Sequence, residues 1–200
     1  MAPGRCSASY GTPVPAFDVD RFVADCLDAA ATDDPVPALR DLMERAVSNP
    51  QALRDRFPVP VDPHDDGILH HSSGLFVSSG IFPRGFETGL HDHSVPAIIG
   101  VWARHEDNLL YRRTNGGLEA DGHRRVETGS VLVLDADAVH DVHAPADGWS
   151  GALHVYLGDL LAVDRSSWAD PTGRPIPFDG ADLERRWSTA AASTGLTAPE

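Results

Sequence analysis

Short β-rich segments separated by turn residues fill the chain from residue 68 to residue 157, and no helical pattern interrupts them. Sequences such as Ser73-Gly74, Asn115-Gly116-Gly117 and Asp121-Gly122 supply the turns. The expected strands are Ile68–His71, Leu75–Phe82, Thr88–His93, Ala97–Arg104, Asn108–Arg113, Gly117–Ala120, His123–Glu127, Ser130–Leu134, Val139–His143 and Gly151–Leu157. This series predicts a mainly β fold, built as a double-sheet jelly roll.

Helical patterns flank the β region. Asp18, Asp34 and Asn49 are expected to start three helices, and proline follows the second and third of them at the first helical position. A further helix is expected from Asp179 through Ala192. The predicted organisation is a flexible N-terminal tail (1–16) and a single domain (17–200), which comprises a helical brace (17–57), the barrel (68–160) and a C-terminal extension (161–200).

The composition limits the partners that this chain can have. The formal net charge of −14 argues against nucleic acid and anionic membrane surfaces, because both require a basic face. No apolar run reaches the length of a membrane span, and the N-terminus lacks the layout of a secretory signal, so a cytoplasmic location is expected. Cys6 and Cys26 are the only cysteines; a disulfide between them is one alternative, and two reduced thiols are the expected one. The oligomeric state has no signal in the sequence.

Three histidines have the spacing of metal ligands. Gly85 is followed after five residues by His91-Asp-His93, a pattern that resembles the first signature of the cupins, a family of metal-binding β-barrels. Two histidines at i and i+2 of a strand project to the same face, so both imidazoles can reach one metal. His140 lies near the end of a later β segment, where the return strand of a barrel would bring it opposite them. Three neutral nitrogen donors leave positions open for substrate and dioxygen.

The second motif keeps its spacing but changes its residues. Gly129 is followed by Asp135, Asp137 and His140, where cupins have proline, glycine and histidine. Cupins also often have a glutamate four or five residues after His-x-His, where this chain has Ala97 and Ile98. The expected site is therefore three histidines without a carboxylate. His143 is the alternative to His140, but it should face the other side of the strand; the other histidines weighed, His64, His105 and His123, are interpreted as surface or core residues.

Three segments together resemble the cysteine dioxygenase family of cupin thiol dioxygenases: His91-Asp-His93, Val139-His140-Asp-Val142 and Leu153-His154-Val-Tyr156. They are most similar to a bacterial branch described as predicted metal-dependent double-stranded β-helix enzymes, and the resemblance covers about residues 68–160. It implies a mononuclear Fe(II) bound by His91, His93 and His140. The implied reaction adds both atoms of O2 to the sulfur of a small thiol, which gives a sulfinate.

The resemblance also implies roles for the last barrel strand. The family's Ser-x-His-x-Tyr group falls on Ala152, His154 and Tyr156, so Tyr156 is expected beside substrate or oxygen, with its hydroxyl held by a hydrogen bond from His154. Ala152 departs from the family pattern. Without a serine hydroxyl there, His154 is expected to use water or Ser150 instead.

Further departures concern the substrate. The thioether-forming cysteine of animal cysteine dioxygenases would fall near Ile98, so that crosslink cannot form, and the expected substrate-binding residues are Ile98, His70, His71 and Arg84. The arginine that binds the carboxylate of cysteine would fall on Asp65, or on His70 or His71 with a shorter hairpin, and Arg84 is the nearest other cation. L-cysteine is therefore an unfavourable substrate, while 3-mercaptopropionate-like acids, thiohistidines and other thiols stay open. Two alternatives remain, namely a cupin iron oxygenase that acts on a non-thiol metabolite and a non-catalytic cupin that binds metal or a ligand.

Overall fold

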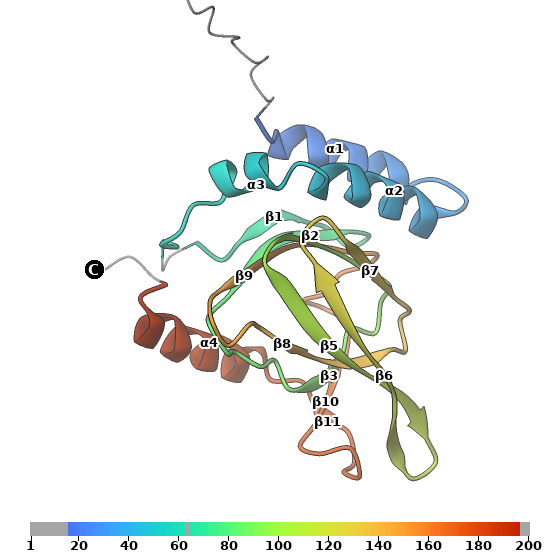
Figure 1. Cartoon of the computed structure of the whole chain (residues 1–200). Helices are drawn as coiled ribbons and strands as arrows, with labels where there is room; N and C mark the ends of the chain where they lie inside the picture. The colour runs from blue at the N-terminus through green and yellow to red at the C-terminus, as the bar shows by residue number, and fades with distance from the viewer. Residues whose placement is uncertain (1–15, 63–64, 197–200) are drawn as a thin grey trace, which may run out of the picture.

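The computed structural model describes residues 16–62 and 65–196. Nearly all of the expected N-terminal tail, together with Cys6 and His64, lies outside the described residues. The fold consists of three N-terminal helices, two antiparallel sheets and a C-terminal helix. Figure 1 shows the three helices grouped over one side of the barrel and the C-terminal helix apart from them at its lower edge.

The strands form two sheets of five and six strands. The five-stranded sheet has the order β1-β2-β9-β4-β7, and its strands are β1 (Ile68–His71), β2 (Phe76–Phe82), β4 (Ala97–Ala103), β7 (Val131–Leu134) and β9 (Ser150–Tyr156). The six-stranded sheet has the order β11-β10-β3-β8-β5-β6, and its strands are β3 (Leu90–Asp92), β5 (His105–Thr114), β6 (Gly117–Glu127), β8 (Val139–His143), β10 (Ser166–Trp168) and β11 (Ile176–Pro177). Every pairing is antiparallel. The predicted cupin double-stranded β-helix is therefore confirmed.

The N-terminal helices begin where the sequence predicts. Asp18 caps α1 (Val19–Ala30) by accepting a hydrogen bond from the Arg21 backbone N–H at 3.0 Å. Proline occupies the first position of both α2 (Pro35–Val47) and α3 (Pro50–Arg56), where its missing N–H costs no helical hydrogen bond.

These helices pack on the outer face of β4. Ile98 and Trp102 point toward the helices and join the same buried cluster as Met43 of α2. Gly100 lies between them, and a Cβ at this position would come within 2.5 Å of the Met43 Sδ atom. The absence of a side chain at Gly100 thus allows close packing of α2 on the sheet. Alternate residues of β4, among them Ile99, face the barrel interior in a second cluster.

Two predictions about strands are corrected. The Asp121-Gly122 pair is not a turn, because β6 continues through it to Glu127. Gly122 has a φ of +146°, and the pairing with β5 shifts register between Leu110 and Tyr111, so the glycine accommodates an irregularity within one long hairpin. The C-terminal extension also contributes strands β10 and β11, which the sequence analysis did not predict, in addition to α4 (Gly180–Thr194), which it did.

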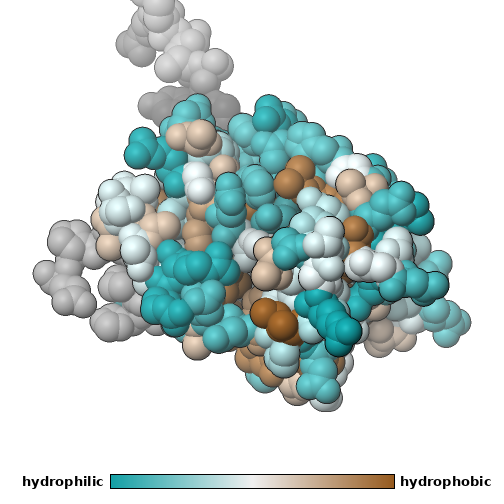
Figure 2. Space-filling view, turned by 90° about the horizontal axis from the view of Figure 1, so that it is seen from below, coloured by the Kyte–Doolittle hydropathy of each residue, from teal (hydrophilic) through white to brown (hydrophobic). Residues whose placement is uncertain are grey.

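Among the described residues, the exposed large hydrophobic side chains are those of Leu27, Ile68, Leu161 and Ile176. On the face shown in Figure 2, hydrophilic residues predominate and the hydrophobic ones form small separate groups. No helix among the described residues is long and apolar enough to cross a membrane. Cys26 of α1 is a free, buried thiol, and burial raises its pKa to about 12.

Candidate metal centre

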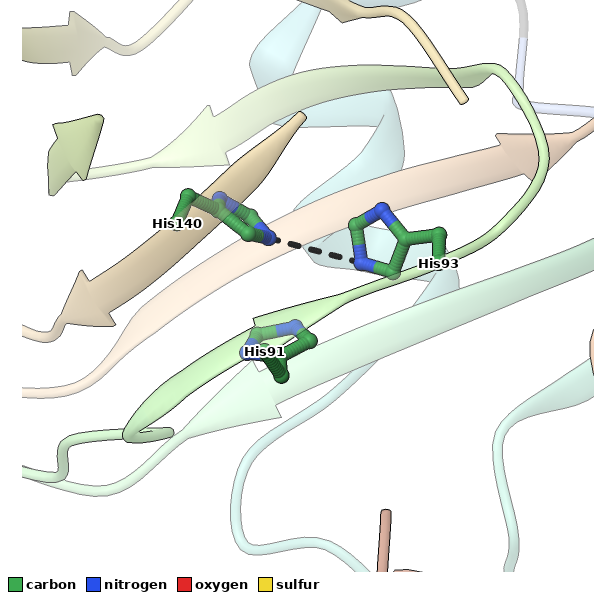
Figure 3. A group of neighbouring side chains, drawn as sticks. All are labelled: His91, His93 and His140. Atoms are coloured by element: carbon green, nitrogen blue, oxygen red, sulfur yellow. Dashed lines mark hydrogen bonds between the residues drawn. The ribbon is translucent and has the colours of Figure 1, made fainter. Parts of the chain in front are cut away.

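His91, His93 and His140 converge inside the barrel (Figure 3). His91 on β3 pairs in register with His140 on β8, and His93 follows β3 by one residue. The ring centroids are separated by 4.6 Å (His91 to His140), 4.9 Å (His93 to His140) and 5.1 Å (His91 to His93). Their donor atoms all lie within 4.8 Å of one another, and no other group of described His, Cys, Asp or Glu residues comes together in this way.

Hydrogen bonds orient two of these imidazoles. The Nδ1–H of His91 donates to the Gly89 carbonyl at 2.9 Å, and the Nδ1–H of His140 donates to Asn108 Oδ1 at 3.0 Å. Each ring therefore presents Nε2 as its free lone pair, which is the arrangement found in metal-ligating histidines. The Nε2 atoms of His93 and His140 face each other at 3.4 Å. A cation between these nitrogens would satisfy both lone pairs, so the three residues fit a metal ion.

Burial keeps the three histidines neutral. It lowers the pKa of His91, and it lowers the pKa values of His93 and His140 well below their ordinary range, with repulsion between the rings adding to the effect. Neutral imidazole is the form that binds a metal. The carboxylate of Asp92 does not belong to the cluster; it is buried and pairs with Arg113. The donor set is thus three uncharged nitrogens.

The other weighed histidines lie outside this cluster. His143 is on the opposite face of β8 from His140, and its Nε2 lies 3.1 Å from Asp141 Oδ2. His105 and His123 approach the same carboxylate, that of Asp107, at 3.7 and 2.7 Å. The structure therefore groups His140 and not His143 with the His-x-His pair.

Tyr156 and His154 project into the barrel from β9. The Tyr156 ring packs edge-on against His93 with 4.9 Å between centroids. The His154 and Tyr156 rings are nearly parallel, 6.1 Å apart, and no hydrogen bond joins them, so the expected hydrogen bond is absent. Burial lowers the pKa of His154 to about 4 and raises the pKa of Tyr156, so at neutral pH the imidazole is uncharged and the phenol is protonated.

Ser150 does not support His154. Its hydroxyl donates to Glu106 Oε1 at 3.0 Å, inside the barrel and fully buried. Burial raises the pKa of Glu106 to about 7, and the hydrogen bond from Ser150 opposes this rise. Glu106 is a buried carboxyl group that the sequence analysis missed, because the residue lies at the start of β5, upstream of the predicted strand.

Two of the expected substrate-binding residues lie away from the histidine cluster. Ile98 faces the helices on the outer side of β4, so its proposed place beside the substrate is wrong. Its strand is buried on both faces, and burial alone could not reveal the side. Arg84 is exposed in the turn between β2 and β3.

The residues of the first hairpin have local partners. His70 Nε2 lies 3.2 Å from Ser72 Oγ, and Asp65 accepts the Gly67 backbone N–H. His71 pairs with Asp159 at 2.8 Å, and its ring contacts Phe76, which in turn contacts Tyr156 with 6.0 Å between centroids. His71 is therefore linked to the candidate site through the Phe76 and Tyr156 rings, and it is already paired with a carboxylate.

Arg165 is a cation near the cluster that the sequence analysis did not identify. It is half-buried, and its guanidinium carbon lies 4.0 Å from the centroid of the Phe178 ring, which is 5.8 Å from that of His91. The charge of Arg165 adds to the burial that lowers the pKa values of His91 and His93, and it opposes the burial that raises the pKa of Tyr156. Arg165 therefore acts electrostatically on three groups of the candidate site.

Pairing of the C-terminal extension with β3 explains the position of Arg165. Ser167 on β10 pairs with His91 on β3, and the Ser166 backbone N–H donates to Asp92 Oδ1 at 3.1 Å. The Ser94 hydroxyl donates to the Asp164 carbonyl at 2.7 Å. Both residues that flank Arg165 are thus bonded to the His-x-His segment. The sequence carried no signal for this pairing beyond a short serine and tryptophan run.

Comparisons with known proteins give no family. The chain matches no family model, and no curated protein matches it. Among solved structures it is similar to a protein of unknown function with a cupin-like fold from Ralstonia eutropha (17% identity, 67% of this chain and 70% of the other, TM-score 0.39). It is also similar to a cupin domain from Bordetella pertussis (21% identity, 45% and 88%, TM-score 0.36) and to a protein from Bacillus halodurans (15% identity, 54% and 74%, TM-score 0.41). The fold assignment rests on the strand order described above.

Proposed function

We propose that this protein is an Fe(II)-dependent dioxygenase that converts a small thiol bearing a carboxylate into the corresponding sulfinate. The observation that carries the proposal is the set of three neutral, buried histidines with a half-buried arginine beside them. Sulfur loses four electrons and O2 gains four, so the reaction needs no further reductant. The thiol proton is released as the sulfinate forms.

The uncharged ligand set suits a thiolate. Fe(II) held by three imidazoles would supply its full positive charge to bind the sulfur as thiolate and would activate O2. His91 and His140 are held by Gly89 and Asn108, so the chain fixes the directions of two donor atoms before the metal arrives. Iron in place of another divalent metal is part of the proposal.

Tyr156 is the residue best suited to orient the reactants. Its ring packs against His93, and its raised pKa keeps the hydroxyl protonated, so that it can donate a hydrogen bond to an anionic sulfur or oxygen. His154 is uncharged at neutral pH, so one ring nitrogen can accept a hydrogen bond and the other can donate one, but the ring carries no acidic proton. The two residues therefore have complementary roles on the inner face of β9.

Arg165 supports an anionic substrate. A guanidinium binds a carboxylate through two parallel hydrogen bonds, and here the Phe178 ring restricts its motion. A thiol whose carboxylate is a short chain away from sulfur could reach the metal and Arg165 together. A 3-mercaptopropionate-like acid is therefore the proposed substrate class. L-cysteine has the same thiol and carboxylate, but its ammonium group would bring a second positive charge close to Arg165, so it is expected to be a poorer substrate.

A panel of related compounds tests the proposal. The iron-loaded protein is incubated with 3-mercaptopropionate, L-cysteine, cysteamine and propionate while oxygen uptake is recorded and products are analysed by mass spectrometry. We expect a gain of two oxygen atoms on 3-mercaptopropionate, slower reaction of L-cysteine and cysteamine, and no reaction of propionate. Oxygen uptake with non-thiols alone would favour the oxygenase alternative, and iron binding without uptake from any compound would favour a non-catalytic cupin.

Substitution of the arginine separates the reaction from the substrate class. Arg165→Gln removes the charge and should raise the KM for 3-mercaptopropionate about ten- to a hundredfold, the usual effect of losing a charged hydrogen bond. The same variant should leave the reaction of cysteamine, which has no carboxylate, nearly unchanged. Equal losses on both thiols would remove Arg165 from substrate binding while leaving thiol oxidation itself in place.

A further inference from the structure

A cleft of about 920 Å³ lies between the linker that follows α3, the start of β1, the second half of β2 and α4. Of the described residues that line it, none is a candidate metal ligand, and Tyr156 and Arg165 are absent as well. Its aromatic lining comes from separate elements, with Phe57 from the linker, Phe86 from the turn after β2 and Trp187 from α4. The cleft is therefore distinct from the candidate metal centre.

The irregular edge of β2 creates this cleft. β1 pairs with the first residues of β2, from Phe76 to Ser78, and beyond them the edge is bridged by single hydrogen bonds. The Ser79 backbone N–H donates to Gly67 at 2.9 Å, and the Trp187 indole N–H donates to the Ile81 carbonyl at 2.6 Å. Gly80 lies between these bridges without a side chain, and a Cβ there would come within 2.9 Å of His154 Cε1. The gap along the edge of β2 thus results from the backbone pairing. His154 is the side chain next to Gly80 in this gap.

The charges that line the cleft are predominantly negative. Asp65 and Asp66 are held in place because one oxygen of each accepts a backbone N–H two residues later at 2.9 Å. Glu184 lines the cleft from α4. Arg56 is the cation among the described lining residues, and it packs on the Phe57 ring. The Ser79 hydroxyl, also in the lining, is buried without a hydrogen-bond partner among the described residues.

We infer that this cleft binds an organic cation, a protonated amine carried on an apolar body. The ammonium group is complementary to the carboxylates of Asp65, Asp66 and Glu184, and the apolar body is complementary to Phe57 and Trp187. The volume is of the size that encloses a small organic ligand. The inference is independent of the reaction proposed for the metal centre.

Calorimetry on the full-length, iron-loaded protein under nitrogen tests this site. The probes are phenethylammonium and 2-phenylethanol, which share an apolar body and differ in charge. Two exposed charge contacts should make the ammonium bind about two- to thirtyfold more tightly than the alcohol. In the triple variant Asp65→Asn, Asp66→Asn and Glu184→Gln, this preference should largely disappear, because the three replacements keep the side-chain shape and remove the charge.

Matched variants fix the location. Glu119→Gln removes an exposed carboxylate on β6 and should keep the preference for the ammonium, and His140→Ala should leave the affinity unchanged. No detectable binding, equal binding of both probes, or retention of the preference in the triple variant would overturn the inference. Loss of binding in His140→Ala would overturn it too, since the probe would then occupy the metal centre. A synthetic peptide of residues 1–15 is tested as a competitor. If it displaced the probe at a peptide concentration below the probe's own Kd, the occupant would be a peptide, and the small-cation inference would be rejected.

Discussion

The two sheets of the barrel differ in how many of their faces are buried. The five-stranded sheet is covered by helices outside and by the barrel interior inside, so every residue of β4 and β9 is buried. In the six-stranded sheet the short β3 is buried throughout, but β5 has one exposed face and alternates: Glu106 and Asn108 are buried, while Asp107 between them is partly exposed. In the six-stranded sheet, alternation therefore reveals which side chains face the interior.

This difference explains where residue assignments succeed. On β8, the odd spacing between His140 and His143 places them on opposite faces, and the structure agrees. On β4, Ile98 and Ile99 are equally apolar and equally buried, yet only Ile99 faces the barrel interior. A continuous apolar strand has no polar residue to mark its inner face.

The largest expected effect tests the two faces of β8. His140→Ala should remove most of the bound iron, because it takes away one of three nitrogen donors. The loss should exceed the ~10- to 100-fold change in affinity typical of removing a residue that only orients a ligand. His143→Ala, on the outer face, should keep its iron. Metal analysis of both purified variants is the measurement, and equal iron content in the two would remove His140 from the ligand set.

The next effect tests the two faces of β4. Ile98→Ala and Ile99→Ala should each lower the free energy of unfolding by about 2–5 kcal/mol, since each opens a cavity in a buried cluster. Only Ile99→Ala should also change turnover, because Ile99 pairs with His154 inside the barrel. Urea unfolding and oxygen uptake measure the two properties. A turnover defect confined to Ile98→Ala would reverse the assignment of faces.

Tyr156→Phe tests the chemistry of the inner face of β9. The variant keeps the ring that packs on His93 and loses the hydroxyl, so iron content and stability should stay near those of the wild type. Turnover of the thiol should fall about ten- to a thousandfold, the range for one positioned polar group. Oxygen uptake at saturating substrate is the readout. Full activity in this variant would leave Tyr156 with a packing role alone.

The smallest effect concerns Glu106. Its folded-state pKa of about 7 exceeds the ordinary value of 4.5, so the folded protein binds the proton more tightly than the unfolded chain does. Stability from this group is present at low pH and is lost as pH rises from 4.5 through 7. Glu106→Gln should match the wild type near pH 5 and exceed its unfolding free energy at pH 8, by at most on the order of 3 kcal/mol.

Urea unfolding at both pH values measures that difference. Glu119→Gln is the control for the same substitution at an exposed carboxyl group. If Glu106→Gln were no more stable than wild type at pH 8, the carboxyl group would be ionised without penalty inside the barrel, contrary to its burial.

Much of the fold was predictable because local signals agree with the tertiary structure. The caps at Asp18 and Asn49 start helices as expected, and the strand pattern from residue 68 predicts the jelly roll. The approach of His91, His93 and His140 was predictable from spacing, because the period of two in a strand fixes a shared face. The role of these histidines as metal ligands remains a prediction. The expected domain boundaries and the expected cellular location also remain predictions.

The unpredicted features depend on contacts between distant parts of the chain. Arg165 lies beside the histidines because β10 pairs with β3, and no local pattern reports such a pairing. Ser150 bonds Glu106 across the barrel and not its neighbour His154, a choice that depends on the geometry between the sheets. The Asp-Gly pair at 121–122 resembles a turn locally, but pairing with β5 keeps it within the strand.

The hold of the C-terminal extension on β3 has a consequence for the order of events during synthesis. Asp92 receives its hydrogen bond from a backbone group 74 residues later, and Arg186 of α4 donates to the carbonyls of Glu87 and Thr88, 99 and 98 residues before it. β3 itself has three residues, and β8 and β10 are the strands that flank it. A growing chain that has been synthesised only as far as β9 therefore still lacks β10, one of the two neighbours of β3. The segment that holds His91 and His93 therefore reaches its finished pairing only after translation has passed Trp168.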